Sequence, residues 1–374
     1  MIEQNKRQEE RYVDGLYLHI PFCAMKCEYC DFCTYINMEK EYGKYTEYII
    51  KELNMYPKYK YNTVYFGGGT PSVLPIEMIT KIFNNIEVEK NAEITLELNP
   101  NDMKKEKLRE LRELGINRLS IGIQSFQDHI LKFVGRDHNG ADAIRVFQEA
   151  REVGFENITI DLMFGIPNQT MEDLKKDLEI IKEIQPDNVS IYSLIWEEGT
   201  IFFGKLKRGI LKEMDQDLEA EMFETIINFL KENGYNHYEI SNFSKNGMEG
   251  RHNLKYWRNE QFLGVGMSAA SFYKNRRYSG VRTFRKYYSL IDKNEIPIDE
   301  KSVEIIDEIE REKLRKMLGL RLVNEGILYF EDKNIEKLVK DGLLEIFKNE
   351  KKEKRLRLTQ KGILLANNVL VEFI

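Results

Sequence analysis

The most constraining feature of the chain is a cysteine-rich stretch, residues 16–33, which reads LYLHIPFCAMKCEYCDFC. All four cysteines of the 374-residue protein lie in it, at positions 23, 27, 30 and 33. The spacing Cys23-x3-Cys27-x2-Cys30 suits a loop that wraps an iron–sulfur cluster, with three thiolates on three irons of a 4Fe–4S cube and one iron left open. Zinc and redox-active thiols are the alternatives, although zinc sites usually add a second, distant pair of ligands.

Composition is that of an ordinary globular protein, and the length predicts two or three domains. The chain is 42% hydrophobic and 32% charged with a net charge of −6, which argues against general nucleic-acid binding. No apolar run approaches the ~20 residues that a membrane span needs. The start of the chain, MIEQNKRQEERY, lacks the apolar core of a signal peptide. We therefore expect a cytoplasmic protein, in which thiols stay reduced.

Between residues 16 and 194, β-branched and aromatic runs alternate with amphipathic patterns. This alternation predicts an α/β fold with a parallel sheet, and six such units suggest a partial barrel. Gly115 and Gly154 follow two of the helices, where a left-handed residue is favoured. The predicted strands are 16–20, 63–66, 94–98, 118–123, 158–164 and 189–194, and the predicted helices are 41–55, 76–85, 104–114, 140–153 and 171–184.

Polar and glycine residues gather near the C-terminal ends of the predicted strands. The cysteine loop follows the first strand and GGGTP, residues 67–71, follows the second, while Glu97, Gln124 and Asp161 belong to the next three. In parallel α/β barrels this rim is where chemistry is built, so we expect one site there. GGGTP is neither a P-loop nor a G-x-G-x-x-G motif, but successive glycines let bare backbone approach a ligand closely.

After residue 194 the composition of the chain changes twice, first to an aromatic and polar segment and then to a charged C-terminal region. A helix over 213–232 precedes an aromatic and polar segment, 235–273, which we assign to ligand binding within a first domain over 1–285. Residues 299–374 are predicted to form a small winged-helix-like α+β domain, whose charged hairpin tip, KNEKKEKR, is expected to be solvated. Its predicted helices are 306–322, 335–341 and 361–370, and its predicted strands are 343–347 and 356–359.

The cysteine spacing after a short strand, together with the glycine loop, resembles the radical SAM superfamily, in which the open iron binds S-adenosylmethionine. Over nearly the whole chain, YLHIPFC, GGGTPS, ELNP, RLSIGIQSF, VGRDH, DLMFGIP and YSLIWEEGT look like the branch that contains anaerobic coproporphyrinogen III oxidase and the heme chaperone HemW. The resemblance implies a partial (β/α)6 barrel. It also implies that Cys23, Cys27 and Cys30 hold the cluster.

The same resemblance implies a pocket for S-adenosylmethionine. Gly67 and Gly68 would meet the amino group of the cofactor and Glu97 its ribose, and an arginine would suit its carboxylate. Tyr17 and His19 would pack near the cluster loop, and no catalytic residue is assigned. The full expected cofactor-binding set is Tyr17, Gly67, Gly68, Thr70, Glu97, Gln124, Arg136, Asp161 and His252.

Two features favour the HemW type over the oxidase type. Only 22 residues precede Cys23, whereas the oxidase type has a long N-terminal segment. Phe32 stands where the oxidase type carries a fourth cysteine, and Cys33 falls one place later. We expect Cys33 to be a bystander thiol, because a fourth thiolate would occupy the open iron. Structural roles are expected for His129, His138 and His237.

HNLKYW, residues 252–257, matches the HNxxYW motif that is associated with heme binding in HemW-like proteins. Imidazole is a common axial ligand of heme iron, and tyrosine or tryptophan rings can stack on a porphyrin. His252 is therefore a candidate heme ligand, and the alternative is a histidine and two aromatic residues packed under the barrel. Ala270 stands where the family often has a histidine, which leaves the ligand set open.

The resulting hypothesis is a HemW-like protein that binds a 4Fe–4S cluster, S-adenosylmethionine and heme. Its expected partners are a heme-accepting protein and an electron donor such as flavodoxin or ferredoxin. The enzymatic alternative is oxidative decarboxylation of coproporphyrinogen III. A third alternative is another radical SAM reaction, such as methyl transfer.

Overall fold

In the computed structural model, which describes residues 13–373, one sheet of twelve strands dominates the fold. Its order is β12-β11-β10-β9-β1-β2-β3-β4-β5-β6-β8-β7, and β1 to β6 are mutually parallel. The predicted six-unit α/β sheet is thus confirmed. The parallel strands are β1 (Gly15–Ile20), β2 (Lys60–Gly68), β3 (Glu87–Leu98), β4 (Arg118–Gln124), β5 (Asn157–Phe164) and β6 (Asn188–Ser193).

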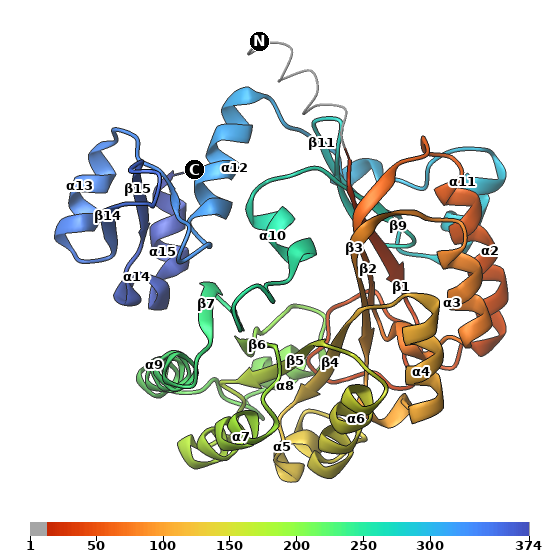
Figure 1. The fold of residues 1–374 in the computed structure, drawn as a ribbon, viewed down its shortest axis with the longest axis horizontal. Helices are drawn as coiled ribbons and strands as arrows, with labels where there is room; N and C mark the ends of the chain where they lie inside the picture. Colours follow the sequence, from red (N-terminus) through yellow and green to blue (C-terminus); the bar gives the residue numbers. More distant parts are fainter. Residues whose placement is uncertain (1–12, 374) are drawn as a thin grey trace.

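Helices cover the outer side of this sheet, and Figure 1 shows α2, α3, α4 and α6 following its curve. Each buries one apolar stripe, as Leu108 and Leu111 of α4 illustrate. Gly115 and Gly154 have φ values of +114° and +95°, the left-handed conformation predicted for them. The helices are α2 (Tyr42–Leu53), α3 (Ile76–Phe83), α4 (Lys105–Leu114), α5 (Asp128–Phe133), α6 (Gly140–Glu152), α7 (Met171–Ile184), α8 (Ile201–Lys207) and α9 (Gln216–Glu232).

Alternate side chains of β1 point to opposite faces of the sheet, one toward the hydrophobic core and the other toward the inner face. Leu16, Leu18 and Ile20 are fully buried in the main hydrophobic core. Tyr17 and His19 point to the opposite face, because successive side chains of a strand alternate. The inner face of the sheet therefore carries polar and aromatic residues, while the outer face packs against helices.

Segment 235–273 extends the sheet at both edges, which the sequence did not predict. On one edge, β9 pairs in parallel with β1, and an antiparallel run continues from it. Helix α10 contacts β2 and lies on the inner side of the sheet (Figure 1). The elements are β7 (Asn236–Glu239), β8 (Asn242–Ser244), α10 (Arg251–Trp257), β9 (Phe262–Val265), β10 (Ala270–Tyr273), β11 (Arg276–Ser279), α11 (Phe284–Asp292) and β12 (Glu304–Ile305).

The C-terminal part forms a small antiparallel sheet of three strands, in the order β13-β15-β14, flanked by helices. The helix predicted over 361–370 is wrong in one respect: it is two helices, because the backbone leaves the helical conformation at Leu365 (φ −111°, ψ 27°). The elements are α12 (Glu308–Gly319), β13 (Ile327–Leu328), α13 (Lys333–Lys340), β14 (Leu344–Lys348), β15 (Lys354–Leu358), α14 (Gln360–Leu364) and α15 (Ala366–Leu370). Short 3-10 helices are η1 (Glu39–Glu41), η2 (Pro71–Val73), η3 (Pro100–Asp102), η4 (Glu300–Ser302) and η5 (Val371–Phe373).

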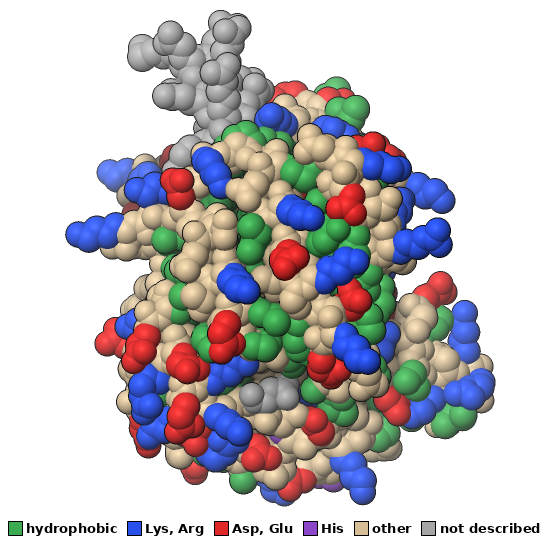
Figure 2. Space-filling model, turned by 90° about the vertical axis from the view of Figure 1, so that its right-hand side faces the viewer, with side chains coloured by type: hydrophobic (Ala, Val, Ile, Leu, Met, Phe, Trp, Pro, Cys, Tyr) green, Lys and Arg blue, Asp and Glu red, His purple; other side chains and the backbone are tan. Residues whose placement is uncertain are grey.

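The surface is of mixed charge on the face drawn in Figure 2, where basic and acidic side chains are interspersed. Such mixing gives that face no extended field of one sign. Among the described residues, no helix combines the length and the apolar character needed to cross a bilayer.

Candidate functional site: two adjoining cavities

The cysteine loop leaves the end of β1 and is closed by backbone hydrogen bonds. Cys23 N donates to the carbonyl oxygen of Tyr35 at 3.0 Å, and Tyr35 N donates to that of Pro21 at 2.7 Å. All four cysteines are free thiols. Cys23, Cys27 and Cys30 line one cavity of about 160 Å³, so the fold brings the three predicted cluster ligands together.

Two hydrogen-bond donors point at these sulfur atoms. The Thr70 hydroxyl donates to Cys23 Sγ at 3.6 Å and the Arg136 guanidinium donates to Cys27 Sγ at 3.5 Å. Burial raises the pKa of the Cys23 thiol to about 11. In the described part of the chain, no three His, Cys, Asp or Glu side chains are grouped to hold a single metal ion. In a 4Fe–4S cluster each thiolate binds a different iron, and donors to sulfur tune such clusters.

The glycine loop lies directly against the cysteine loop. Gly69 N donates to the carbonyl oxygen of Ile20 at 2.8 Å. A Cβ atom at Gly69 would lie 2.5 Å from the carbonyl oxygen of Phe22 and 3.0 Å from Cys23 Sγ. Only glycine allows this approach, and Gly68 adopts a left-handed φ of +112°. The bare backbone of the loop forms a cradle that the polar end of a ligand can approach.

Two half-buried carboxyl groups face the same cavity. Glu97 accepts hydrogen bonds from the Tyr65 hydroxyl at 2.7 Å and from Gly68 N at 3.2 Å. Asp161 accepts one from the Ser120 hydroxyl at 2.9 Å. Burial raises the pKa of Glu97 to about 7 and that of Asp161 to about 6, although these hydrogen bonds oppose the shift. Both groups can accept hydrogen bonds from hydroxyl or ammonium groups of a ligand.

A fixed cation and an amide complete the cavity. Arg136 donates to Asn99 Oδ1 at 2.7 Å, and Asn99 Nδ2 donates to the Thr70 hydroxyl at 2.9 Å. Gln124 ends β4 with a left-handed φ of +72°, and its Oε1 accepts from the Tyr192 hydroxyl at 2.9 Å. A guanidinium held in this way can pair with a carboxylate in a defined orientation.

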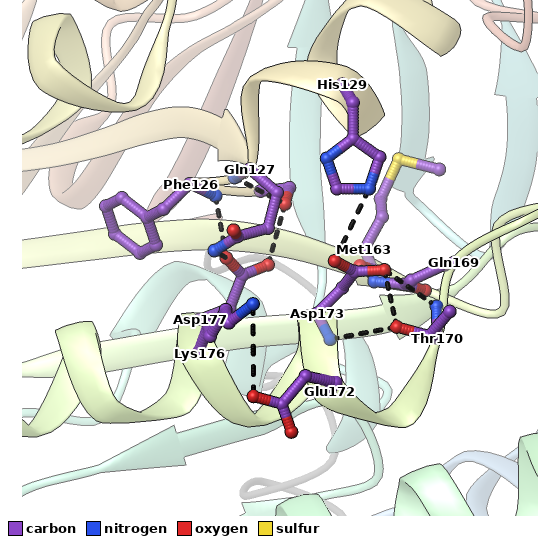
Figure 3. A network of polar contacts seen from close by, with 11 residues as sticks. Phe126, Gln127, His129, Met163, Gln169, Thr170, Glu172, Asp173, Lys176 and Asp177 are labelled. Carbon is purple, nitrogen blue, oxygen red and sulfur yellow. Dashed lines mark hydrogen bonds and ion pairs between the residues drawn. The ribbon is translucent and has the colours of Figure 1, made fainter.

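A buried carboxylate from α7, that of Asp177, fixes the loop that follows β4 (Figure 3). Asp177 accepts hydrogen bonds from Ser125 Oγ at 2.7 Å, Phe126 N at 2.9 Å and Gln127 Nε2 at 2.9 Å. Three donors on one carboxylate leave the loop little freedom. The network therefore positions Gln124 at the cavity wall.

A second cavity, of about 470 Å³, lies between the cysteine loop, α10 and the β9–β11 extension. Phe32 lines both cavities, so the two adjoin each other. The walls of this second cavity include six aromatic side chains, and Ala270 also lines it. The aromatic residues are Tyr17, Phe32, Tyr256, Trp257, Phe262 and Phe272.

Cys33 and His19 face this second cavity. Cys33 is buried, and its Sγ donates to the carbonyl oxygen of Arg282 at 3.5 Å. His19 Nε2 lies 3.0 Å from the carbonyl oxygen of Cys33, and its Nδ1 lies 3.1 Å from the Tyr17 hydroxyl. Burial lowers the pKa of His19 to about 4, so its ring is neutral near pH 7. Cys33 thus lies apart from the cavity that the other three cysteines share.

His252 lies behind the wall of the second cavity. Its Nδ1 is 2.9 Å from Thr63 Oγ1, its Nε2 is 2.8 Å from the Tyr256 hydroxyl, and its ring stacks on Tyr65 at 5.4 Å. Glu93 holds the start of α10 by accepting from the backbone N–H of His252 at 2.9 Å. Both imidazole nitrogens are thus engaged, whereas Tyr256 faces the cavity.

Comparison with known proteins identifies the family. The model of the radical SAM superfamily matches residues 17–181. The heme chaperone HemW of Lactococcus lactis is 37% identical to the chain, with 96% of this chain and 97% of that protein covered. The chain belongs to the HemW family. HemW of Bacillus subtilis is 36% identical, with 96% and 98% covered. The structure is similar to that of coproporphyrinogen III oxidase (HemN) from Escherichia coli, with a TM-score of 0.81, 22% identity, and 99% and 93% covered, which supports the radical SAM fold.

Membership of the radical SAM superfamily implies a 4Fe–4S cluster and S-adenosylmethionine, and the side chains that line the first cavity suit both groups chemically. It offers three free thiols and a glycine cradle to the two groups. Most residues expected in the cofactor pocket of this HemW-family chain line that cavity. They are Gly68, Thr70, Glu97, Gln124, Arg136 and Asp161.

Three expected residues lie elsewhere. Tyr17 lines the second cavity, His252 lies behind it, and Gly67 packs between Tyr65 and Tyr17. The three remaining histidines each have a protein partner. His129 Nε2 is 3.3 Å from Asp173, His138 Nε2 is 3.0 Å from the Ile123 carbonyl oxygen, and His237 Nε2 is 3.0 Å from that of Ile240.

Several residues of the first cavity were missed by sequence reasoning. They include Ser120, Gly122 and Tyr192. The signal for two of them was present, because Ser120, Gly122 and Gln124 alternate along β4 and so share its inner face. Tyr192 could have been inferred in the same way from its position near the end of β6.

Proposed function

We propose that this protein is a heme chaperone of the HemW type, which binds heme as cargo and hands it to an acceptor protein. The observation that carries the proposal is the 37% identity to Lactococcus lactis HemW over nearly the full length of both chains. The HNLKYW motif on α10 and the two adjoining cavities support it. The cluster and S-adenosylmethionine, when bound, supply one-electron chemistry that side chains alone lack.

The first cavity would hold the resident cofactors through residues with distinct roles. Cys23, Cys27 and Cys30 would hold the cluster. Gly68 would present its bare backbone to the amino group of S-adenosylmethionine, and Glu97 would accept hydrogen bonds from its ribose. These assignments match the chemistry of each group, because carboxylates suit hydroxyl donors and backbone carbonyls suit ammonium groups.

Arg136, Asp161 and Gln124 would complete the same pocket. Arg136 is already oriented by Asn99 and would pair with the carboxylate of the cofactor. We propose that a one-electron donor such as flavodoxin or ferredoxin reduces the cluster.

For His252 we propose an indirect contribution to heme binding. Direct coordination of iron stays a prediction, and it would require His252 to give up its contact with Thr63 or with Tyr256. Without such a rearrangement, His252 acts as a positioning residue that orients the Tyr256 hydroxyl at the cavity wall. Substitution of His252 would then weaken heme binding without changing the axial ligand of the iron.

An anaerobic heme titration, followed by absorbance with the reconstituted cluster subtracted, tests the proposal. The native protein is expected to bind heme saturably. His252→Ala is expected to bind more weakly but with an unchanged Soret position, whereas a shifted Soret band would identify His252 as the iron ligand. Absence of saturable binding to the native protein would overturn the chaperone proposal. Conversion of coproporphyrinogen III to protoporphyrinogen by that protein would then favour the oxidase activity.

A further inference from the structure

The second cavity has the size and lining of a site for a flat, largely apolar ligand. Its volume of about 470 Å³ lies within the range of small-molecule sites, which run from about 300 to 1,000 Å³. Tyr256 and Phe262 meet edge to face on one wall, with ring centroids 4.6 Å apart. Tyr17 and Phe272 line it from β1 and β10. Aromatic faces and edges of this kind pack well against a conjugated macrocycle.

Two arginines bring positive charge to the wall of this largely apolar cavity. Arg277 of β11 and Arg282, shortly after it, both line the cavity. Within residues 13–373, neither is found in an ion pair with a carboxylate, and the Arg282 guanidinium donates to the backbone carbonyl oxygen of Asp31 at 3.5 Å. Asp31 and Glu260 also line the cavity, and the Lys255 ammonium, 3.3 Å from Glu260 and 2.6 Å from Asp14, offsets only part of this negative charge.

The two guanidinium groups are mounted on well-defined backbone. Arg277 is the cross-strand partner of Phe272 in the β10–β11 pair, so the cation and an aromatic wall residue are neighbours. The backbone of Arg282 is fixed to the cysteine loop, because its carbonyl oxygen accepts from the Tyr35 hydroxyl at 2.7 Å. Two cations on the wall of one cavity can pair with a ligand that carries two carboxylates.

We propose that the second cavity is the heme site, with the macrocycle between the aromatic walls and the two propionates paired with Arg277 and Arg282. This assignment rests on the proposed chaperone function and gives it a location. It places the cargo beside Phe32, which borders the cluster cavity as well. It also gives the pocket a chemical selectivity that apolar packing alone would lack, because an esterified porphyrin offers no charge to the arginines.

The test combines substitutions in the protein with a change in the ligand. Heme and heme dimethyl ester are titrated into native protein, Arg277→Met and Arg282→Met. Arg276→Met is the matched control, since Arg276 is an exposed neighbour on the same strand and does not line the cavity. Each cavity variant is expected to bind heme about tenfold more weakly than native protein, as lost charge-assisted hydrogen bonds predict. None of the variants should change the affinity for the diester.

The possible results separate the site from the function. If native protein binds heme and the Arg277 and Arg282 variants bind it equally well, the cavity assignment is overturned while the chaperone function stands. Equal losses for heme and diester would mean general damage to the fold and would also overturn the propionate pairing. If native protein binds neither ligand, the chaperone function itself fails. A loss confined to heme, with Arg276→Met unaffected, is the result that this site predicts.

Discussion

The two cavities differ in the residues that line them, and the cysteines show this difference most clearly. Three cysteines line the smaller cavity beside the glycine loop, while Cys33 faces the larger aromatic one. The thiol spacing alone did not assign Cys33 to either side. Its placement follows from the backbone turn that returns the loop to β1 at Tyr35.

Cys33→Ser is therefore expected to retain the cluster after anaerobic reconstitution, whereas Cys30→Ser should lose most of it. The reason is that a serine at position 33 leaves the three thiols of the smaller cavity untouched. Iron content and the visible absorbance of the cluster provide the measurement. Loss of iron from Cys33→Ser comparable to that from Cys30→Ser would make Cys33 a ligand.

Glu97 predicts a pH dependence for the binding of S-adenosylmethionine. Burial raises the pKa of Glu97 to about 7, so the side chain becomes protonated as pH falls through that value. The protonated side chain is a weaker acceptor for the ribose hydroxyls. Affinity should decline as pH falls from 8 towards 6, and Glu97→Gln should bind more weakly at pH 8. The variant should keep only the dependence that arises from Asp161, with its pKa of about 6. Equal pH profiles for the two proteins would contradict the assigned role.

At the scale of elements, one buried glutamate joins three parts of the fold. Glu52 of α2 accepts hydrogen bonds from the Tyr287 hydroxyl of α11 at 2.6 Å and from Gly266 N, just after β9, at 2.9 Å. Tyr45 of the same helix donates to the carbonyl oxygen of His19 at 2.9 Å. Helix α2 thus holds the β9 extension against β1, which in turn shapes the second cavity.

The pKa of Glu52 is raised by burial from 4.5 to about 7, which predicts how stability changes with pH. Because the folded state binds this proton more tightly, its contribution is fully present below pH 4.5 and is lost as pH rises through about 7. Glu52→Gln should remove a slope of up to ~1.4 kcal/mol per pH unit from the unfolding free energy in this window. Urea unfolding across the window measures it, with exposed Glu47→Gln as the control. An unchanged slope in Glu52→Gln would contradict the inference.

The elements also show how far the sequence could predict the fold. Strands β1 to β6 and their helices were predictable because each β/α unit is a local pattern. The pairing of β9 with β1 was not, because β9 has only four residues and joins Gly15 to Phe262 across most of the chain. A local sequence pattern cannot indicate a pairing between two strands that lie so far apart in the chain.

In the whole molecule two cavities adjoin. The residues of the first, proposed to hold the cofactors, could largely be predicted from the sequence, whereas those of the second are brought together only by the tertiary fold. The cysteine spacing and the place of Glu97 near the end of a predicted strand pointed to this cavity from the residues themselves, whereas Arg136 was expected only from the resemblance of VGRDH to a family motif. Arg277 and Arg282 carry no such signal, since their place at a cavity depends on the β10–β11 hairpin lying beside β1. Phe32 borders both cavities, and so places the proposed heme site next to the cluster.

The measurement that tests this two-cavity account most directly is a joint titration of heme and S-adenosylmethionine on one sample of anaerobically reconstituted protein. Among the described residues the two cavity linings have only Phe32 in common, so saturating S-adenosylmethionine should leave heme binding saturable and of unchanged stoichiometry. The reverse titration should give the same result. Mutual displacement of the two ligands would contradict the account, because it would mean that they share one site.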